Sequence, residues 1–387
     1  MRTSIGRMND FPQATFEAWQ ARVTAVLKGK GGAEKLNSLT ADGFRMEPLY
    51  QQIHGPRAAR AKHGPWAVLQ RVDHPDISKA NAQILDDLQN GADGLVIARQ
   101  FDARLLDDVA LHAIAVRLEG GALLAKEFAA FVDSQPIDPA RLHVSFGLQH
   151  DALADDLQAQ GFTGPFLEAD GRGYHNHGAT EAQELACVLA DIVSALRQNE
   201  TTAPERLIGA TLAANQDMFL CMAKFRALRL LWARVLEACK IPFGALRLHG
   251  ETSRRMIAKL DPHSNILRAT AAVFGGGLGG ADSISVLPFS IAQGVSNGFA
   301  RRIARNTQLI LLEESQLWRV ADPASGSGYV ESLTQELCEQ AWEIFQGIEK
   351  TGKSPEFDPG NSSSDPVVGT KTYQLLEEFE AAVEFLP

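Results

Sequence analysis

From Trp66 onwards, short apolar runs alternate with amphipathic stretches that have helical spacing, among them 78–91, 102–113, 123–135 and 179–198. The apolar runs are nearly continuous, which is typical of strands covered on both faces. Eight such runs have the length and composition of strands: 67–72, 94–99, 113–120, 142–148, 165–171, 207–212, 245–251 and 282–288. Repeated strand–helix alternation predicts a parallel sheet. Eight units favour a closed (β/α)8 barrel of the TIM type over a doubly wound open sheet.

The pattern divides the chain into an N-terminal arm over 1–64, the barrel over 65–310 and a C-terminal helical extension over 311–387. The arm combines a helical stretch with polar segments that Pro and Gly interrupt, so we expect it to wrap another surface. The extension predicts a helix over 332–350, a Gly/Ser/Pro-rich stretch and a last short helix. The glycine-rich segment 275–280 is predicted as a turn that follows a helix and precedes a strand, which is the wrong order for a dinucleotide or phosphate loop.

Composition narrows the possible partners and the location. The chain has 387 residues and a net charge of −10, so it lacks the basic excess that a nucleic-acid partner requires. No apolar run approaches the ~20 residues of a membrane helix, and the N-terminus lacks a secretory signal. The four cysteines form no C-x-x-C pair, and the Cys/His pattern predicts no metal site. We therefore expect a cytoplasmic protein with free thiols.

Candidate functional side chains follow from the barrel itself. In (β/α)8 barrels, ligand-binding groups lie at the carboxyl ends of the strands and in the loops after them. The positions that meet this rule are Arg71, Arg99, Glu119, Gln149, Tyr174, His175, Arg247, His249 and Glu251.

Two segments carry a family resemblance. The order of RLHGETS (247–253), a Gly-rich segment, ADSISVLP (281–288) and a basic helix around Arg301 resembles the coenzyme A-binding barrel of the methylmalonyl-CoA mutase family, most closely its small, non-catalytic-type subunit. The segment GYHNHGAT (173–180) resembles the G-Y-H and G-A-T of its catalytic chains. The resemblance implies that His175 would hydrogen-bond a thioester carbonyl, with Tyr174 beside it. It also implies a set of substrate-binding residues, namely Arg206, Arg247, His249, Glu251 and Ser283.

Several positions depart from the catalytic pattern. A tyrosine of the family's first strand is replaced by Arg71, a charge that would have to be desolvated beside a radical site. A glutamine is replaced by Glu251, which cannot donate a hydrogen bond when ionised. We expect Arg247 and Glu251 to form an ion pair within a disused barrel. The D-x-H-x-x-G signature of the family's cobalamin-binding domain does not occur, so we expect that domain to be absent.

The resemblance therefore implies a small subunit of an adenosylcobalamin-dependent methylmalonyl-CoA mutase, which interconverts methylmalonyl-CoA and succinyl-CoA. Such a subunit would be structural, with a degenerate active site and inactive alone, and would form a heterodimer with a longer catalytic subunit. Adenosylcobalamin would belong to the complex and would not be bound by this chain alone. Two alternatives stay open: the catalytic barrel of a split acyl-CoA mutase that uses a separate cobalamin-binding polypeptide, and a repurposed barrel that binds acyl-CoA.

Overall fold

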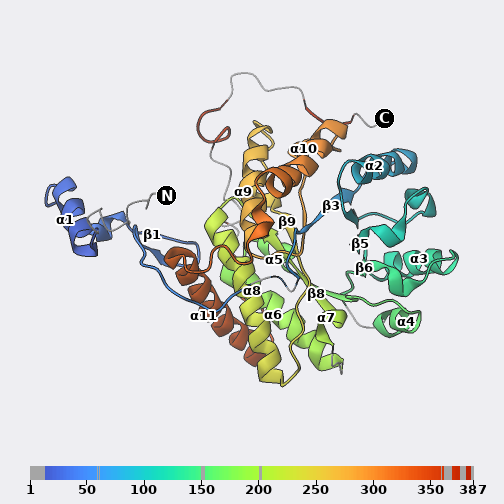
Figure 1. Cartoon of the computed structure of the whole chain (residues 1–387), viewed down its shortest axis with the longest axis horizontal. Helices are drawn as coiled ribbons and strands as arrows, with labels where there is room; N and C mark the ends of the chain where they lie inside the picture. Colours follow the sequence, from blue (N-terminus) through green and yellow to red (C-terminus); the bar gives the residue numbers. More distant parts are fainter. Residues whose placement is uncertain are drawn as a thin grey trace, which may run out of the picture.

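Eight parallel strands form the centre of the molecule in the computed structural model, which describes residues 14–58, 60, 62–149, 153–199, 203–358, 360, 368–374 and 381–384 (Figure 1). Residues 1–13 of the predicted arm lie outside this description, as do 361–367, 375–380 and 385–387 of the predicted extension, including part of its last short helix. The strands are β3 (Ala67–Val72), β4 (Gly94–Ile97), β5 (Ala115–Leu118), β6 (His143–Ser145), β7 (Leu167–Asp170), β8 (Ile208–Ala214), β9 (Leu248–Thr252) and β10 (Ser283–Ser285).

The sheet closes on itself. Its strand order is β6-β5-β4-β3-β10-β9-β8-β7, and every neighbouring pair is parallel. Just beyond β6, Leu148 forms a bridge with Leu167 of β7. The Leu148 N–H donates to the Phe166 carbonyl at 3.0 Å, and the Glu168 N–H donates to the Leu148 carbonyl at 2.8 Å. The predicted (β/α)8 barrel is confirmed, and the open-sheet alternative is wrong because both edge strands are paired.

Helices cover the outside of the barrel. A capping box, in which Thr180 and Gln183 satisfy each other's backbone N–H groups, fixes the start of α6 (Glu181–Gln198), the second helix after β7. The α-helices of the barrel and its extension are α2 (Ile77–Gln89), α3 (Gly121–Asp133), α4 (Ala154–Ala159), α5 (Gly171–Asn176), α6 (Glu181–Gln198), α7 (Pro204–Leu207), α8 (Met218–Cys239), α9 (Ser264–Leu278), α10 (Gly298–Leu309) and α11 (Gly328–Thr351). Short helical turns are η2 (Ala33–Leu36), η5 (Pro139–Arg141), η7 (Arg254–Met256), η9 (Leu317–Arg319) and the π-turn η8 (Ile310–Glu314).

One predicted helix, over 102–113, is wrong. The segment instead forms two short 3-10 helices, η3 (Ala103–Leu106) and η4 (Leu111–Ala113). Asp108, between them, has a φ of +61°, a left-handed conformation that interrupts a right-handed helix.

The predicted glycine-rich turn is shorter than expected, because Gly275, Gly276 and Gly277 are part of α9 and only Gly279 and Gly280 form the turn before β10. A Cβ on Gly275 would lie 2.7 Å from the Met218 carbonyl oxygen of α8. A Cβ on Gly277 would lie 2.6 Å from the Trp66 ring. The glycines therefore serve close packing of α9 against α8 and the start of β3.

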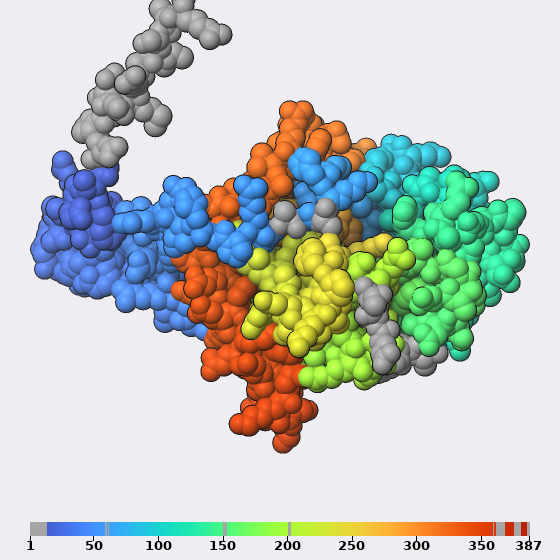
Figure 2. Space-filling view, turned by 60° about the horizontal axis from the view of Figure 1, so that its bottom comes forward, coloured from blue at the N-terminus to red at the C-terminus, as the bar shows by residue number. Residues whose placement is uncertain are grey.

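The N-terminal arm extends from one end of the molecule (Figures 1 and 2). It begins with α1 (Phe16–Val26) and a small hairpin, β1 (Ser38–Leu39) and β2 (Arg45–Met46). Further along, the arm is anchored on the barrel. The Ala58 N–H donates to Asp322 Oδ2 at 3.0 Å, and Arg60 donates to the carbonyls of Gly277 and Ala281.

The far end of the described chain also touches the barrel. Val383 forms a β-bridge with Ser296, and the Glu384 carboxylate lies 3.0 Å from His74 Nε2 and 3.0 Å from Lys79 Nζ. No helix in the described ranges is long and apolar enough to cross a lipid bilayer.

Candidate functional site

Charged side chains fill the carboxyl-terminal half of the barrel interior. Side chains alternate across a strand, so every second residue points to the barrel axis. On β5 and β9 these inward residues include Arg117 and Glu251, both at most 5% exposed. The charged group, called the lumen cluster below, consists of Arg71, Arg117, Glu119, Glu168, Arg172 and Glu251.

The lumen cluster is a connected network of ion pairs. Arg71 bridges Glu119 at 2.8 Å and Glu251 at 2.9 Å. Arg172 pairs with Glu119 at 2.9 Å and with Glu251 at 3.1 Å. Arg117 connects Glu119 at 2.9 Å to Glu168 at 3.1 Å on β7, which lies on the other side of β6. Three arginines thus neutralise three glutamates within the barrel.

The electrostatics keep Glu119 and Arg172 ionised. Burial opposes the charge of Glu119, but the guanidiniums of Arg172, Arg117 and Arg71 outweigh it and hold the pKa of Glu119 far below its usual range. Burial likewise opposes the charge of Arg172. The neighbouring carboxylates, of which Glu251 has the largest effect, outweigh burial and raise the Arg172 pKa. Each partner therefore compensates the desolvation of the other, as buried ion pairs require.

His249 lies next to the cluster and is neutral. Its Nδ1 lies 2.8 Å from Ser283 Oγ, and its Nε2 lies 3.1 Å from Ser285 Oγ. Burial, and next the charge of Arg117, lower the pKa of His249 well below its ordinary value. Ser285 in turn donates to Glu251 at 3.3 Å. The structure thus brings three predicted substrate-binding residues, His249, Glu251 and Ser283, into one hydrogen-bonded group.

The predicted ion pair between Arg247 and Glu251 is wrong. Four residues of extended chain span about 13 Å, so these side chains occupy different levels of the barrel. Arg247 donates to the Gly164 carbonyl at 2.9 Å, whereas Glu251 pairs with Arg71 and Arg172. Burial, the leading cause, lowers the pKa of Arg247.

Cavities lie on both sides of the cluster. One of about 650 Å³ opens at the carboxyl ends of β5, β6 and β7, and includes Glu119, Gln149 and Arg172. Another, of about 130 Å³, lies at the amino-terminal end and is lined by predicted residues Arg247, His249 and Ser283. Arg206, on α7, is not among its lining residues. Arg117 and Glu168 line both cavities and so separate them.

His175 lies on α5 and is fully engaged by protein groups. Its Nε2 lies 2.7 Å from Ser253 Oγ, and its Nδ1 lies 3.4 Å from Glu184 Oε2. Glu184 also accepts from buried Lys224 at 2.6 Å. Ser253, His175 and Glu184 follow the order of a Ser–His–acid triad. His175 and Ser253 are only 1% and 2% exposed, however, so a substrate cannot reach them. Burial, the leading cause, lowers the pKa of His175 and keeps the ring neutral.

Tyr174 points away from His175. Its hydroxyl donates to Asp191 Oδ2 at 3.0 Å, in a separate cavity of about 610 Å³ along α6. Burial, followed by the Asp191 carboxylate, raises the pKa of the Tyr174 hydroxyl. The structure does not bring the two predicted catalytic residues together in one cavity.

Sequence reasoning missed three members of the cluster, Arg117, Glu168 and Arg172. Arg117 and Glu168 each stand directly between two apolar residues, in VRL (116–118) and LEA (167–169). A charge within such a run is costly to bury unless it is paired. The sequence therefore indicates that Arg117 and Glu168 are paired, but it does not show with which residues.

The described residues contain no group of three or more His, Cys, Asp or Glu side chains placed to hold a metal ion. The cluster carboxylates already accept from arginines. With its described side chains in place, the barrel interior can exclude water and hold charge, but it presents no free acid or base to a ligand on its axis.

Comparison with known proteins supplies the family. Residues 166–356 match the family model described as methylmalonyl-CoA mutase. The chain is 36% identical to a protein of Streptomyces virginiae named methylmalonyl-CoA mutase small subunit, over 88% of this chain and 64% of that protein. The correspondingly named protein of Propionibacterium freudenreichii subsp. shermanii is 34% identical over 90% of this chain and 64% of its own length. The Escherichia coli protein named methylmalonyl-CoA mutase is 27% identical over 87% of this chain and 58% of its own. The chain thus spans less than two thirds of the length of these relatives.

Proposed function

Because this chain belongs to the methylmalonyl-CoA mutase family, we propose that it is a small subunit of an adenosylcobalamin-dependent methylmalonyl-CoA mutase and that its role is structural. The names of its relatives support a small subunit that works beside a larger one. The proposed partner is a longer mutase chain that carries the active site, and the proposed assembly is a heterodimer.

The lumen cluster is the observation that carries the structural role. The family resemblance implies an acyl-CoA that runs through the barrel, and such a ligand would have to pass between Arg117 and Glu168. Opening that path breaks buried ion pairs, and removing one partner of such a pair costs about 3–5 kcal/mol. Glu251 would also repel a carboxylated acyl group. The ordinary state of this barrel is therefore closed.

The two resemblance-derived catalytic positions support the same conclusion. His175 is held by Ser253 and Glu184 beneath the surface, and Tyr174 bonds Asp191 in another cavity. Neither side chain can reach a thioester on the barrel axis without breaking these contacts. We propose that both are structural in this chain.

The residues present do not fit adenosylcobalamin at the barrel mouth. Arg71 stands where the resembling catalytic chains carry a tyrosine, and both its ion-pair partners lie within the lumen. A corrin placed over this position would contact the Arg71 guanidinium, which already forms ion pairs with Glu119 and Glu251. We therefore derive no chemical step through the cofactor and propose that the larger subunit binds it.

The test uses the chain with and without the larger mutase subunit. Isothermal titration of the purified chain with succinyl-CoA, and an absorption titration with adenosylcobalamin, should show no binding. Isomerisation of methylmalonyl-CoA should appear only when the larger subunit is added. Binding of succinyl-CoA alone would favour the repurposed acyl-CoA-binding barrel. Turnover with a separate cobalamin-binding polypeptide would favour the split mutase, and either result would overturn the proposal.

A further inference from the structure

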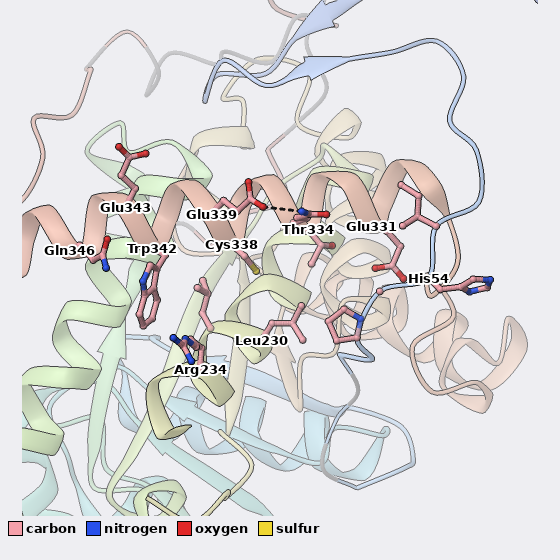
Figure 3. A pocket seen from close by; sticks show the side chains of 15 residues that line it. His54, Leu230, Arg234, Glu331, Thr334, Cys338, Glu339, Trp342, Glu343 and Gln346 are labelled. Carbon is pink, nitrogen blue, oxygen red and sulfur yellow. Dashed lines mark hydrogen bonds between the residues drawn. The ribbon is translucent and has the colours of Figure 1, made fainter. Parts of the chain in front are cut away.

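An elongated groove lies between α8 and α11, on the side of the molecule away from the barrel axis (Figure 3). It encloses about 670 Å³. The arm closes one end with residues 53–56, and Trp342 stands towards the other. Its apolar lining consists of Ile53, Pro56, Leu230, Leu231, Cys338 and Trp342.

The α11 rim of this groove is acidic. Glu339 and Glu343 stand one helical turn apart and are both exposed. Glu339 accepts from Gln335 at 2.9 Å, and neither carboxylate forms an ion pair with any described residue. On the α8 rim, the charge of Arg234 is already matched by Glu237 at 2.6 Å. The rim therefore carries an unbalanced negative charge above an apolar floor.

The α1 helix has the complementary character. Phe16, Trp19, Val23 and Leu27 recur at helical spacing and form one apolar stripe. None of the residues of α1 is buried in the described structure. From Thr15 to Lys30 the chain has one acidic residue, Glu17, and three basic residues, Arg22, Lys28 and Lys30. The stripe residues are only half-buried within their own chain. An incompletely covered apolar stripe with basic neighbours matches an apolar groove with an acidic rim.

The arm holds α1 away from the groove of its own chain. Figure 1 shows α1 at the far end of the arm, beyond the β1–β2 hairpin. The hairpin is fastened to the body, because the Ala182 N–H donates to Asp42 Oδ1 at 3.2 Å and Gln340 donates to the Asp42 carbonyl at 3.3 Å. At 1.5 Å per residue, α1 is about 16 Å long, and the α11 segment that lines the groove is about 24 Å long. The helix therefore fits within the length of the groove.

We propose that, without its larger partner, this chain forms a symmetric dimer in which α1 of each copy lies in the α8–α11 groove of the other. Each copy gives one helix and receives one, so the contact closes on itself and does not build a filament. The apolar stripe covers Leu230 and Leu231, and Arg22, on one flank of the stripe, faces Glu339 and Glu343. The proposal does not rest on the proposed mutase role, and its tests need no mutase subunit.

The first test is sedimentation equilibrium of the purified chain at micromolar concentration. We expect a dimer, and we expect Val23→Glu to weaken it at least about tenfold, because a charge would enter the apolar contact. Ala25→Glu adds the same charge to the opposite face of the same helix and should leave the dimer intact. A monomeric wild-type chain, or a dimer that Val23→Glu and Ala25→Glu affect equally, would contradict the proposal. Circular dichroism checks that both variants remain folded.

The second test identifies the two surfaces. In a Cys239→Ser background, chains carrying Arg22→Cys are mixed with chains carrying Glu339→Cys and oxidised. A disulfide between the two chains is expected, and the same mixture with Ala25→Cys in place of Arg22→Cys should give none. No linkage, or equal linkage with both helix positions, overturns the proposed contact. Because the two cysteines are on different chains, closure of α1 onto its own groove cannot produce the linked species.

Discussion

His175 Nε2 lies 2.7 Å from Ser253 Oγ, and both side chains are almost completely buried. The histidine that resemblance would make catalytic is therefore part of the packing between α5 and the loop after β9. Glu184 and Lys224 complete this buried polar group. Such networks are stable only when every member keeps its partners.

Ser253→Ala should lower the free energy of unfolding by about 1–3 kcal/mol, because it leaves a buried ring nitrogen of His175 without its partner. Urea unfolding followed by circular dichroism measures the change. Ser194→Ala on the exposed face of α6 removes the same hydroxyl and should change stability by no more than about 0.5 kcal/mol. Equal losses in the two variants would show that the buried contact is unimportant.

Tyr174→Phe should leave the isomerisation rate of the proposed complex with a larger mutase subunit unchanged. The hydroxyl is bonded to Asp191 and faces away from the barrel axis. A group that takes part in acid–base chemistry contributes about 10²–10⁴-fold to the rate. A loss of that size in steady-state kinetics, with the complex still assembled, would restore the catalytic assignment of Tyr174.

Glu251→Gln should destabilise the barrel by about 3 kcal/mol, because Arg71 and Arg172 each lose a buried partner. Adding Arg71→Tyr should recover part of this loss, since it removes one of the two unbalanced charges. A double-mutant cycle in urea, with Arg71→Tyr alone as the third corner, measures the coupling. Strict additivity of the two changes would argue against a connected lumen cluster.

Docking of the β1–β2 hairpin should weaken as pH rises through about 6. Burial, and next the Glu181 carboxylate, raise the pKa of Asp42 from 3.8 to about 6. A raised carboxyl pKa means that the folded state binds the proton more tightly than the unfolded chain. The resulting stabilisation is complete below 3.8 and is lost as pH passes the folded-state value.

Hydrogen exchange of residues 38–46 on either side of pH 6 tests this prediction, with Asp42→Asn as the reference at each pH. Asparagine keeps an acceptor for the Ala182 N–H but does not titrate in this range. The ratio of wild-type to Asp42→Asn exchange should therefore rise with pH. A constant ratio would mean that Asp42 does not control the hairpin.

Deleting residues 1–64 should abolish co-purification with the proposed larger mutase subunit and lower the mutase activity of the mixture. Apolar and aromatic residues of the arm, such as Trp19 and Leu49, are of the types enriched in interface cores. Deleting residues 1–13 alone is the matched control and should preserve both readouts. If the longer deletion still co-purifies with full activity, the arm serves only its own barrel or a second copy of this chain.

Much of the fold could be predicted because its causes are local. Six of the eight barrel strands fall within a predicted apolar run and β8 and β9 overlap one, since a strand buried against helices must be apolar over at least one face. The failure at 102–113 has an equally local cause, the left-handed conformation of Asp108, which helical spacing does not report. The failure at Gly275 and Gly277 is different in kind. Glycine is required at these positions because α8 and Trp66 pack too closely to leave room for a side chain. The sequence pattern does not show which segments pack so closely.

The sequence by itself determined the barrel, its family resemblance and the positions where that resemblance breaks, Arg71 and Glu251. Only the tertiary structure decided what those substitutions do. Arg71 and Glu251 are 180 residues apart in the chain, yet they meet at 2.9 Å because only β10 separates β3 from β9 in the closed sheet. Arg247, four residues from Glu251, cannot reach it because an extended strand carries it to another level. Periodicity is a property of neighbours along the chain, whereas charge pairing within a closed barrel depends on distance in space.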